Sequence, residues 1–357
     1  MIAFIVRRLL WCVVLVLLMT FATFVIFFVV PPPSQQAGGR TEATRFDITT
    51  ATGVSDGPVI EQWSQYVWHA VRHGSLGRSA RTAVPISETI KAAVPVTASL
   101  LIGGTLLFML IAVPIGILSA LRPRSLLDRF AMVFVLLGVA AHPAWIGLIL
   151  SYFFGYRWHL VPVSQYCDFI NPSTECGGAV QWGYHLLLPW FTFAILFAAL
   201  YVRMIRAAVM ESLHEDYVRT ARAKGGSGWH VLRSHVLRNA AMPVVMMLGM
   251  DIGVAFGGAV FIETVFGLPG MGQTLVTALN QRDLPLLLGV IIVTTTAIAI
   301  FNLIADVCYF ALDPRVRLTT ASADFGDAPR RPTRARGTAR RPALGLDAQS
   351  QRSTAST

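Results

Sequence analysis

Residues 203–243 read RMIRAAVMESLHEDYVRTARAKGGSGWHVLRSHVLRNAAMP, and they form a polar loop between two long apolar segments. In its first part, from Ser212 to Lys224, apolar and small side chains recur at the 3.6-residue spacing of an amphipathic helix. Glu215 and Arg219 stand four residues apart with the acid first, the order that favours an ion pair on a helix. The polar loop is therefore predicted to begin with a short helix over 212–224.

A glycine turn follows this predicted helix. Gly225 stands where a helix C-cap requires a residue that tolerates a positive φ. Ser227 or Gly228 can then cap a second helix that starts near Trp229. Two short helices around a glycine turn, on one side of a membrane, form a compact projection that another protein can grip.

The composition indicates an integral membrane protein. Apolar residues make up 54% of the 357 and charged residues only 13%, whereas soluble proteins average about 25% charged. The net charge of +10 raises the question of a nucleic-acid partner. However, the arginines cluster beside apolar spans, as the positive-inside rule predicts, so we expect contact with anionic membrane lipid and no nucleic acid.

Several motifs together resemble one family. The run Asp216–Gly225, followed by Leu237–Ala240 and Pro243, resembles the cytoplasmic EAA loop of ABC-importer permeases in its dipeptide/oligopeptide form. The similarity continues in four further runs, which are Gly74-Ser75-Leu76-Gly77-Arg78-Ser79, Glu263-Thr264-Val265-Phe266, Pro269-Gly270-Met271-Gly272 and Leu312-Asp313-Pro314-Arg315. One departure is Pro31-Pro32-Pro33, where this family usually has Pro-Gly-Asp-Pro.

The resemblance implies an all-α integral membrane protein with the type-I ABC importer permease fold, six transmembrane helices and both termini in the cytoplasm. It implies a bacterial cell membrane, and it implies three kinds of partner: a second homologous permease, two ATPase subunits and an external solute-binding protein. The polar loop would dock in a cleft of an ATPase. The residues expected at this contact are Glu215, Asp216, Tyr217, Arg219, Thr220, Ala221, Arg222, Ala223, Lys224 and Gly225.

The sequence shows no nucleotide-binding loop. A P-loop lysine follows a glycine and precedes Ser or Thr, and neither Lys91 nor Lys224, the two lysines of the chain, has such neighbours. No catalytic set or metal-ligand cluster is evident in the sequence either. We therefore expect a protein that is not an enzyme and binds no cofactor or metal itself, with ATP and Mg²⁺ held by the partner ATPases.

Six apolar segments are long enough to cross a bilayer, which takes about 20 apolar residues. Arg7 and Arg8 precede the first, whose length argues against a cleaved signal peptide. The predicted spans are Leu9–Val30, Val94–Leu121, Phe130–Tyr156 with a kink near Pro143, Tyr184–Tyr201, Met242–Ile262 and Leu287–Leu312.

These spans divide the chain into four parts. Residues 1–30 hold the first transmembrane helix, and 31–92 form an external segment that includes a helix. Residues 93–318 form a five-helix permease core that contains the polar loop. Residues 319–357, rich in Ala, Pro, Arg, Ser and Thr, cannot bury a core and are expected to form a disordered basic cytoplasmic tail.

The fifth span carries a carboxylate at its middle. Asp251 should avoid lipid, because a charge near the bilayer centre is costly. It points away from Gly249, Gly253 and Gly257, a ladder of small residues suited to close helix packing. Two interpretations remain open: Asp251 lines the translocation path and meets a cationic group of the solute, or it pairs with a polar or basic group on another helix. Glu263, which is expected to open the next external loop, is also assigned to the path.

Cys167 and Cys176 lie in the predicted external loop between the third and fourth spans. That compartment permits disulfides, so we favour a bridge between them over two free thiols.

Two classes of function remain open. The first is a transmembrane subunit of an importer for dipeptides, oligopeptides or a similar solute, with nickel or another small solute as alternatives. The second is a membrane scaffold or sensor without a solute path. Asp251 favours transport, because a scaffold has little reason to keep a charged residue inside a span. The sequence does not identify the solute, whose selection lies largely with the binding protein.

Overall fold

The computed structural model describes residues 2–29, 58–169 and 176–312. Within these ranges the chain forms helices and isolated bridges but no β-strand, which confirms the all-α prediction. The basic tail predicted over 319–357 lies outside the described residues.

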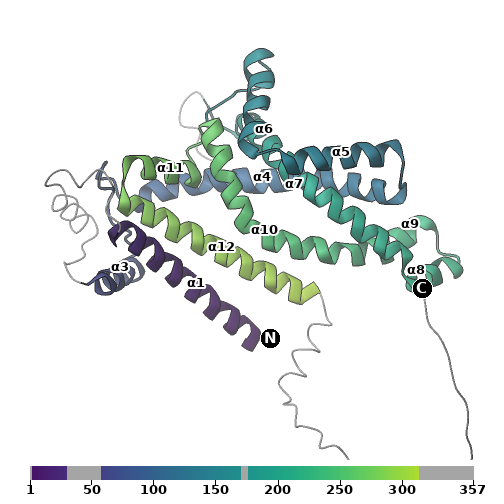
Figure 1. Cartoon of the computed structure of the whole chain (residues 1–357), viewed down its shortest axis with the longest axis horizontal. Helices are drawn as coiled ribbons and strands as arrows, with labels where there is room; N and C mark the ends of the chain where they lie inside the picture. Colours follow the sequence, from purple (N-terminus) through teal and green to yellow (C-terminus); the bar gives the residue numbers. More distant parts are fainter. Residues whose placement is uncertain (1, 30–57, 170–175, 313–357) are drawn as a thin grey trace, which may run out of the picture. The chain divides into compact units, whose positions relative to one another are not determined.

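Most of the described chain is in long helices (Figure 1). In chain order the elements are α1 (Ile2–Val29), α3 (Val59–His73), α4 (Ile86–Leu121), α5 (Leu126–Ala140), α6 (Pro143–Leu150), the π-helix η2 (Ser151–Arg157), α7 (Ala179–His214), α8 (Asp216–Ala223), α9 (Gly228–Val231), the π-helix η3 (Leu232–Val236), α10 (Leu237–Phe266), α11 (Met271–Gln281) and α12 (Leu284–Leu312).

Four helices are long and apolar enough to cross a bilayer alone: Val6–Ile26 within α1, all of α4, all of α7 and Leu284–Val307 within α12. Two bent helix pairs bring the number to six if each pair is one span. Leu126–Ala140 and Pro143–Arg157 meet at 109°, and Gly228–Asp251 and Gly253–Phe266 meet at 57°. The six predicted spans therefore each have a helical counterpart, although two of them are bent.

The pair α4 and α7 forms the centre of the helix bundle (Figure 1). Gly104 and Gly116 of α4 lie so close to Phe193 and Ile205 of α7 that a Cβ atom at either glycine would clash. Small residues permit this close approach, and the large side chains of α7 fill the space that they leave. Phe193 is fully buried and belongs to the main hydrophobic core, which extends from α4 across α7 to α10.

The third predicted span is broken rather than kinked. α5 ends at Ala140, and α6 begins at Pro143 after a change of direction of 109°. His142 adopts φ −74° and ψ 139°, the extended conformation that a following proline favours. Its Nδ1 accepts a hydrogen bond from the N–H of Ala144, so His142 caps the new helix. The change of direction near Pro143 was therefore predicted, but it is a break between two helices and not a kink within one helix.

Other helix boundaries extend beyond the predicted spans. α4 begins at Ile86, inside the segment expected to be external up to residue 92. α7 runs without interruption from Ala179 to His214, although its predicted span ends at Tyr201. Both helices therefore continue beyond their apolar sections. At its C-terminal end α7 leads directly to α8.

α1 packs along α12 at one side of the bundle (Figure 1). Arg8 of α1 lies 3.1 Å from the carboxylate of Asp306 on α12, an ion pair between the two helices.

Candidate functional site

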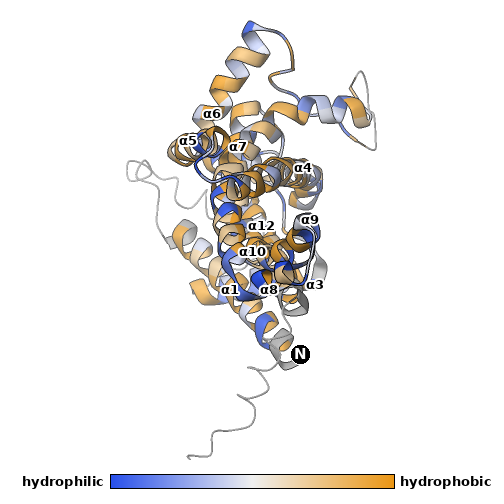
Figure 2. Cartoon of the chain, turned by 90° about the vertical axis from the view of Figure 1, so that its right-hand side faces the viewer, coloured by the Kyte–Doolittle hydropathy of each residue, from blue (hydrophilic) through white to orange (hydrophobic). Residues whose placement is uncertain are grey.

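The polar loop forms a helix–turn–helix projection, residues Glu215–Val231, which we call the elbow. It lies between the end of α7 and the start of η3, which continues directly into α10. Figure 1 places α8 and α9 at one end of the long helices and α11 near the other, and Figure 2 shows hydrophilic residues at α8. The elbow thus lies between two long helices, α7 and α10.

Gly225 adopts the left-handed conformation expected of it, with φ +84°. Its N–H donates to the carbonyl of Arg222 over 3.0 Å, and the N–H of Gly226 donates to the carbonyl of Ala221 over 3.2 Å. These bonds satisfy carbonyl groups at the end of α8, as glycine-terminated helices commonly do. Ser227 then caps α9 by accepting a hydrogen bond from the N–H of His230, so the predicted turn and cap are confirmed.

The helix predicted over 212–224 is interrupted at Glu215. This residue is extended, with φ −68° and ψ 146°, and it separates α7 from α8. The hydroxyl of Ser212 donates to the carbonyl of Val236 over 3.3 Å and is hydrogen-bonded to the hydroxyl of Tyr217 over 2.7 Å. These contacts fold the end of α7 against α8 and η3, which a straight helix would not permit.

The ion pair expected between Glu215 and Arg219 is absent for the same reason, because Glu215 lies outside α8. Arg219 instead has Nη1 3.6 Å from Oδ1 of Asp216, one turn along the helix. Both side chains are mostly exposed, so this pair contributes little to stability. The charges of α8 remain accessible to a partner.

The exposed surface of the elbow includes nearly all the residues expected at the ATPase contact. Val218 is the buried residue of α8 and belongs to the same hydrophobic cluster as Val231 of α9. Ala221 is half-buried, and the other expected contact residues are exposed: Glu215, Asp216, Tyr217, Arg219, Thr220, Arg222, Ala223, Lys224 and Gly225.

The sequence interpretation missed Trp229 as a candidate contact residue. Its side chain is 69% exposed at the start of α9, beside the glycine turn. Tryptophan is enriched at the energetically dominant positions of protein interfaces. A large aromatic residue on a short polar helix was the signal in the sequence that could have identified it.

Asp251 forms a hydrogen bond between α10 and α7. The hydroxyl of Tyr201 donates to Oδ2 of Asp251 over 2.9 Å, and Tyr201 is fully buried with its ring centroid 4.8 Å from that of Phe108. Asp251 itself is half-buried. The structure therefore shows a polar partner on another helix, and a role in the translocation path stays a prediction.

The glycine ladder of α10 packs closely at one position only. A Cβ atom at Gly249 would clash with Ala305 of α12, whereas one at Gly253 would make an ordinary contact with Ile298. Gly257 is exposed and has no neighbouring atom within 4 Å of such a Cβ. The bend of 57° between Asp251 and Gly253 explains the difference, because it changes the direction of α10 partway along the ladder. The predicted packing is thus correct at Gly249 and wrong at Gly257.

Glu263 does not open a loop, because it lies within α10 and is fully buried. Its Oε2 accepts hydrogen bonds from the N–H groups of Gly272 and Gln273 over 2.7 and 3.0 Å. Its Oε1 accepts from the hydroxyl of Thr97 over 2.6 Å, and that hydroxyl oxygen accepts from the N–H of Met271. A carboxylate is well suited to this place, because the first N–H groups of a helix lack partners inside the helix. Glu263 thus joins α10, α4 and α11 inside this chain.

Glu263 also explains the glycines of the Pro269–Gly272 motif. A Cβ atom at Gly270 or at Gly272 would clash with the carboxylate of Glu263. The backbone therefore approaches the carboxylate closely enough for the hydrogen bonds to form only because these two residues lack side chains.

The Gly74–Ser79 motif docks against the turn between α11 and α12. Asp283, in that turn, is buried and accepts hydrogen bonds from the hydroxyl of Ser79 and from the N–H groups of Ala80 and Leu286. Arg81 also donates from Nε to the carbonyl of Gln281 over 2.9 Å. The segment before α4 is therefore fixed to the end of α11.

Cys167 and Cys176 form the predicted disulfide, with their Cα atoms 5.3 Å apart. The bridge joins the two sides of the loop between η2 and α7.

The chain matches the family described as binding-protein-dependent transport system inner membrane component over residues 112–318. Residues 1–101 match the N-terminal part of membrane components of such systems. The two matches together include the described helices and the elbow, apart from residues 102–111 within α4.

Several named proteins are similar over most of their length. The probable D,D-dipeptide transport system permease protein DdpB of Escherichia coli (strain K12) is 35% identical over 279 residues, which cover 73% of this chain and 81% of that protein. The dipeptide transport system permease protein DppB of the same strain is 33% identical over 279 residues, covering 73% and 82%. The oligopeptide transport system permease protein AppB of Bacillus subtilis (strain 168) is 33% identical over 277 residues, covering 77% and 86%.

Proposed function

This chain belongs to the family of binding-protein-dependent transport system inner membrane components, and from that membership we propose that it is a permease subunit of an ABC importer for dipeptides or oligopeptides. Members of this family are membrane transport subunits rather than enzymes. The peptide substrate is inferred from the names of the similar proteins.

The observation that carries the proposal is the construction of the elbow. Its charged side chains are exposed, Gly225 holds the turn, and its two ends continue into α7 and α10. A protein that grips the elbow therefore acts on both of these helices at once. Such rigid attachment is what the coupling of a soluble motor to a membrane bundle requires.

The importer that we propose contains two permeases, two ATPases and a solute-binding protein. The elbow of each permease docks in a cleft of an ATPase on the cytoplasmic side, where both chain termini also lie. ATP binding draws the two elbows together, and α7 and α10 transmit this movement to the bundle. By this rigid-body movement, the solute path between the two permeases closes on one side of the membrane and opens on the other.

Asp251 has two roles in this proposal. Its hydrogen bond with Tyr201 orients the carboxylate between α7 and α10, two helices that are attached to the elbow. Because Asp251 is only half-buried, its carboxylate also has an accessible side, which we assign to the path between the permeases. A carboxylate there suits the cationic amino terminus of a peptide.

Reconstitution tests the proposed function. The chain is assembled with its partner permease, ATPases and binding protein in proteoliposomes, and labelled dipeptides are supplied on the side of the binding protein. We expect accumulation of dipeptide that requires both ATP and the binding protein. ATP hydrolysis without accumulation of any dipeptide or oligopeptide would contradict the peptide assignment.

A further inference from the structure

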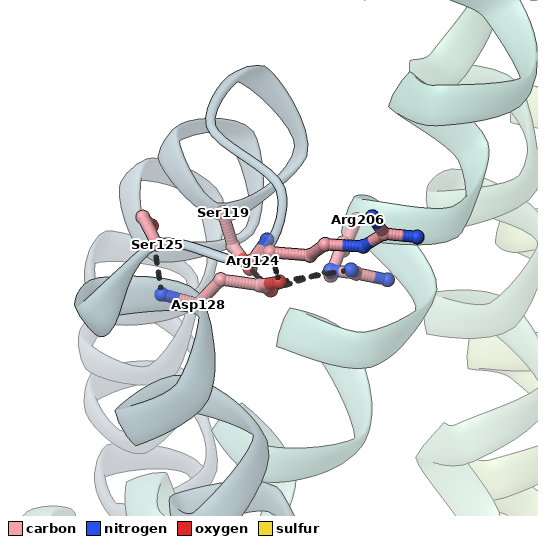
Figure 3. Close-up of polar contacts among 5 residues, drawn as sticks. All are labelled: Ser119, Arg124, Ser125, Asp128 and Arg206. Atoms are coloured by element: carbon pink, nitrogen blue, oxygen red, sulfur yellow. Dashed lines mark hydrogen bonds and ion pairs between the residues drawn. The ribbon is translucent and has the colours of Figure 1, made fainter.

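A buried carboxylate outside the sites described above lies near the start of α5. Asp128 is 5% exposed, and both of its oxygens bind the guanidinium group of Arg206 on α7. Nε of Arg206 donates to Oδ1 over 2.7 Å and Nη2 donates to Oδ2 over 3.0 Å. Figure 3 shows the Asp128 side chain extending from α5 toward the guanidinium group of Arg206 on α7. Bidentate pairs of this kind are both strong and geometrically specific.

The same carboxylate also binds the end of α4 and the turn that follows it. The hydroxyl of Ser119, on α4, donates to Oδ1, and the N–H of Arg124 donates to Oδ2 over 2.9 Å (Figure 3). Arg124 has φ +65°, which is uncommon for a residue other than glycine. Four donors from three segments therefore converge on Asp128, and they join α4, the α4–α5 turn and α5 to α7.

Arg206 occupies a position on α7 that is close to the elbow. It lies about two helical turns before His214, where α7 ends and the elbow follows. At that end, Ser212 is hydrogen-bonded both to Tyr217 of α8 and to Val236 of η3. A continuous helix thus connects the contacts that hold the elbow with the contacts that hold Asp128.

Trp182 and Trp190, in the first half of α7, donate hydrogen bonds to Ser99 of α4. Other contacts of α7 with α4 and α5 are apolar. Gly104 and Gly116 on α4 pack against α7, and Gly138 on α5 packs against Ala199. Apolar contacts have no preferred direction, and packed helices can slide over one another by small shear movements. A fork of charge-assisted hydrogen bonds resists such sliding because its donors and acceptors must stay aligned.

From this geometry we propose that Asp128 and Arg206 form a positioning contact that makes α4 and α5 move with α7 when the elbow moves. The inference rests on the proposed coupling role of the elbow. Without the contact, the elbow and α7 would still follow the ATPase, but α4 and α5 would lag behind. ATP hydrolysis would then continue while fewer peptides cross the membrane.

The test measures the number of peptides transported per ATP hydrolysed by the complete importer in proteoliposomes, with binding protein and labelled dipeptide. Asp128→Asn keeps the size of the side chain and removes its charge. We expect this ratio to fall at least threefold, while membrane insertion and co-purification of the ATPases stay normal. Asp306→Asn is the matched control, because it removes the 3.1 Å ion pair with Arg8 on helices that do not carry the elbow. Its ratio should equal that of the wild type.

A second variant covers the case in which Asp128→Asn fails to assemble. Arg206→Lys keeps a positive charge beside Asp128 but cannot form the bidentate pair of hydrogen bonds. It should also lower the ratio at least twofold in an assembled complex.

A wild-type ratio in the variants that assemble would overturn the inference. This includes a loss of uptake and hydrolysis by the same factor, because a contact that only stabilises the fold reduces the amount of active importer and leaves the ratio unchanged.

The proposed function is tested separately in the same assay. Gly225→Val should impair ATPase association. If Gly225→Val is impaired and Asp128→Asn has a normal ratio, the elbow still couples and only the positioning contact is rejected. If Gly225→Val associates and transports normally, the coupling role of the elbow itself is rejected.

Discussion

The hydroxyl of Tyr201 on α7 donates a 2.9 Å hydrogen bond to Asp251 on α10. Asp251 lies where the two halves of α10 meet at 57°. The bond therefore joins α7 and α10, the two long helices attached to the elbow, at the place where α10 changes direction. This position makes Asp251 sensitive to a change in the relative placement of α7 and α10.

Substitutions at the two ends of this bond separate a path role of Asp251 from a structural one. Asp251→Asn removes the charge and keeps the size, whereas Tyr201→Phe removes the hydrogen bond and keeps the charge. We predict that Asp251→Asn lowers uptake severalfold, most strongly for cationic peptides, with assembly intact. Tyr201→Phe should lower uptake less than Asp251→Asn does, and by the same factor for cationic and neutral peptides.

The measurement for this pair is uptake of cationic and neutral dipeptides by reconstituted importer. An equal loss of assembly in both variants would identify a structural pair, since losing one buried hydrogen bond costs about 1–3 kcal/mol. Unchanged uptake of every peptide by Asp251→Asn would remove this residue from the path.

Gly225→Val should weaken the grip of the ATPase on the elbow. A β-branched residue at φ +84° costs on the order of 1–2 kcal/mol or more, so the turn between α8 and α9 is expected to deform. The amount of ATPase that co-purifies with the permease should fall. Gly228→Ala is the control, because Gly228 begins α9 and a Cβ atom there meets no neighbour. Equal ATPase recovery in both variants would show that the turn geometry is not required.

Glu263→Gln should destabilise the folded chain. Both carboxylate oxygens of Glu263 accept hydrogen bonds from N–H or hydroxyl donors. In glutamine, one of these oxygens is replaced by an NH₂ group, which is itself a donor and would face another donor. We predict a loss of about 1–3 kcal/mol, observed as a lower midpoint of thermal unfolding in detergent. Glu61→Gln, at an exposed position in the first turn of α3, should leave the midpoint nearly unchanged. A midpoint for Glu263→Gln equal to that of Glu61→Gln would refute this role of Glu263.

Trp229→Ala should weaken ATPase docking at least tenfold in affinity, since it removes a large exposed aromatic side chain from the elbow. Titration of purified permease with the ATPase measures this affinity. Trp68→Ala serves as the control, because Trp68 is 60% exposed but lies on α3, away from the elbow in the chain. Similar affinities for both variants would place Trp229 outside the interface.

Local features of the elbow could be predicted from the sequence because their causes are local. A glycine after a polar helix and a serine two residues later specify a left-handed turn and a cap, and both occur at Gly225 and Ser227. The break at Glu215 could not be predicted in this way. It depends on the contact of Ser212 with Val236, which comes from the following helix.

The polar contacts between helices could not be predicted for the same reason. Glu263 is hydrogen-bonded to Thr97, 166 residues away in the chain, and Arg206 is hydrogen-bonded to Asp128, 78 residues away. Hydropathy identified the spans in which these residues lie or which they border, but it does not give the rotation of one helix against another. Asp251 was the exception, because a charge inside an apolar span predicts a partner or a path without naming it.

Photo-crosslinking at the elbow tests most directly whether this surface contacts the ATPase. A photo-reactive amino acid replaces Arg222, an exposed residue of α8, and in a control protein it replaces Leu110, which is 72% exposed on the apolar helix α4. After illumination of the assembled importer, we predict a product that contains permease and ATPase from the position 222 protein and none from the position 110 protein. An importer that transports peptide but yields no ATPase product from position 222, or the same yield from both positions, would contradict the account.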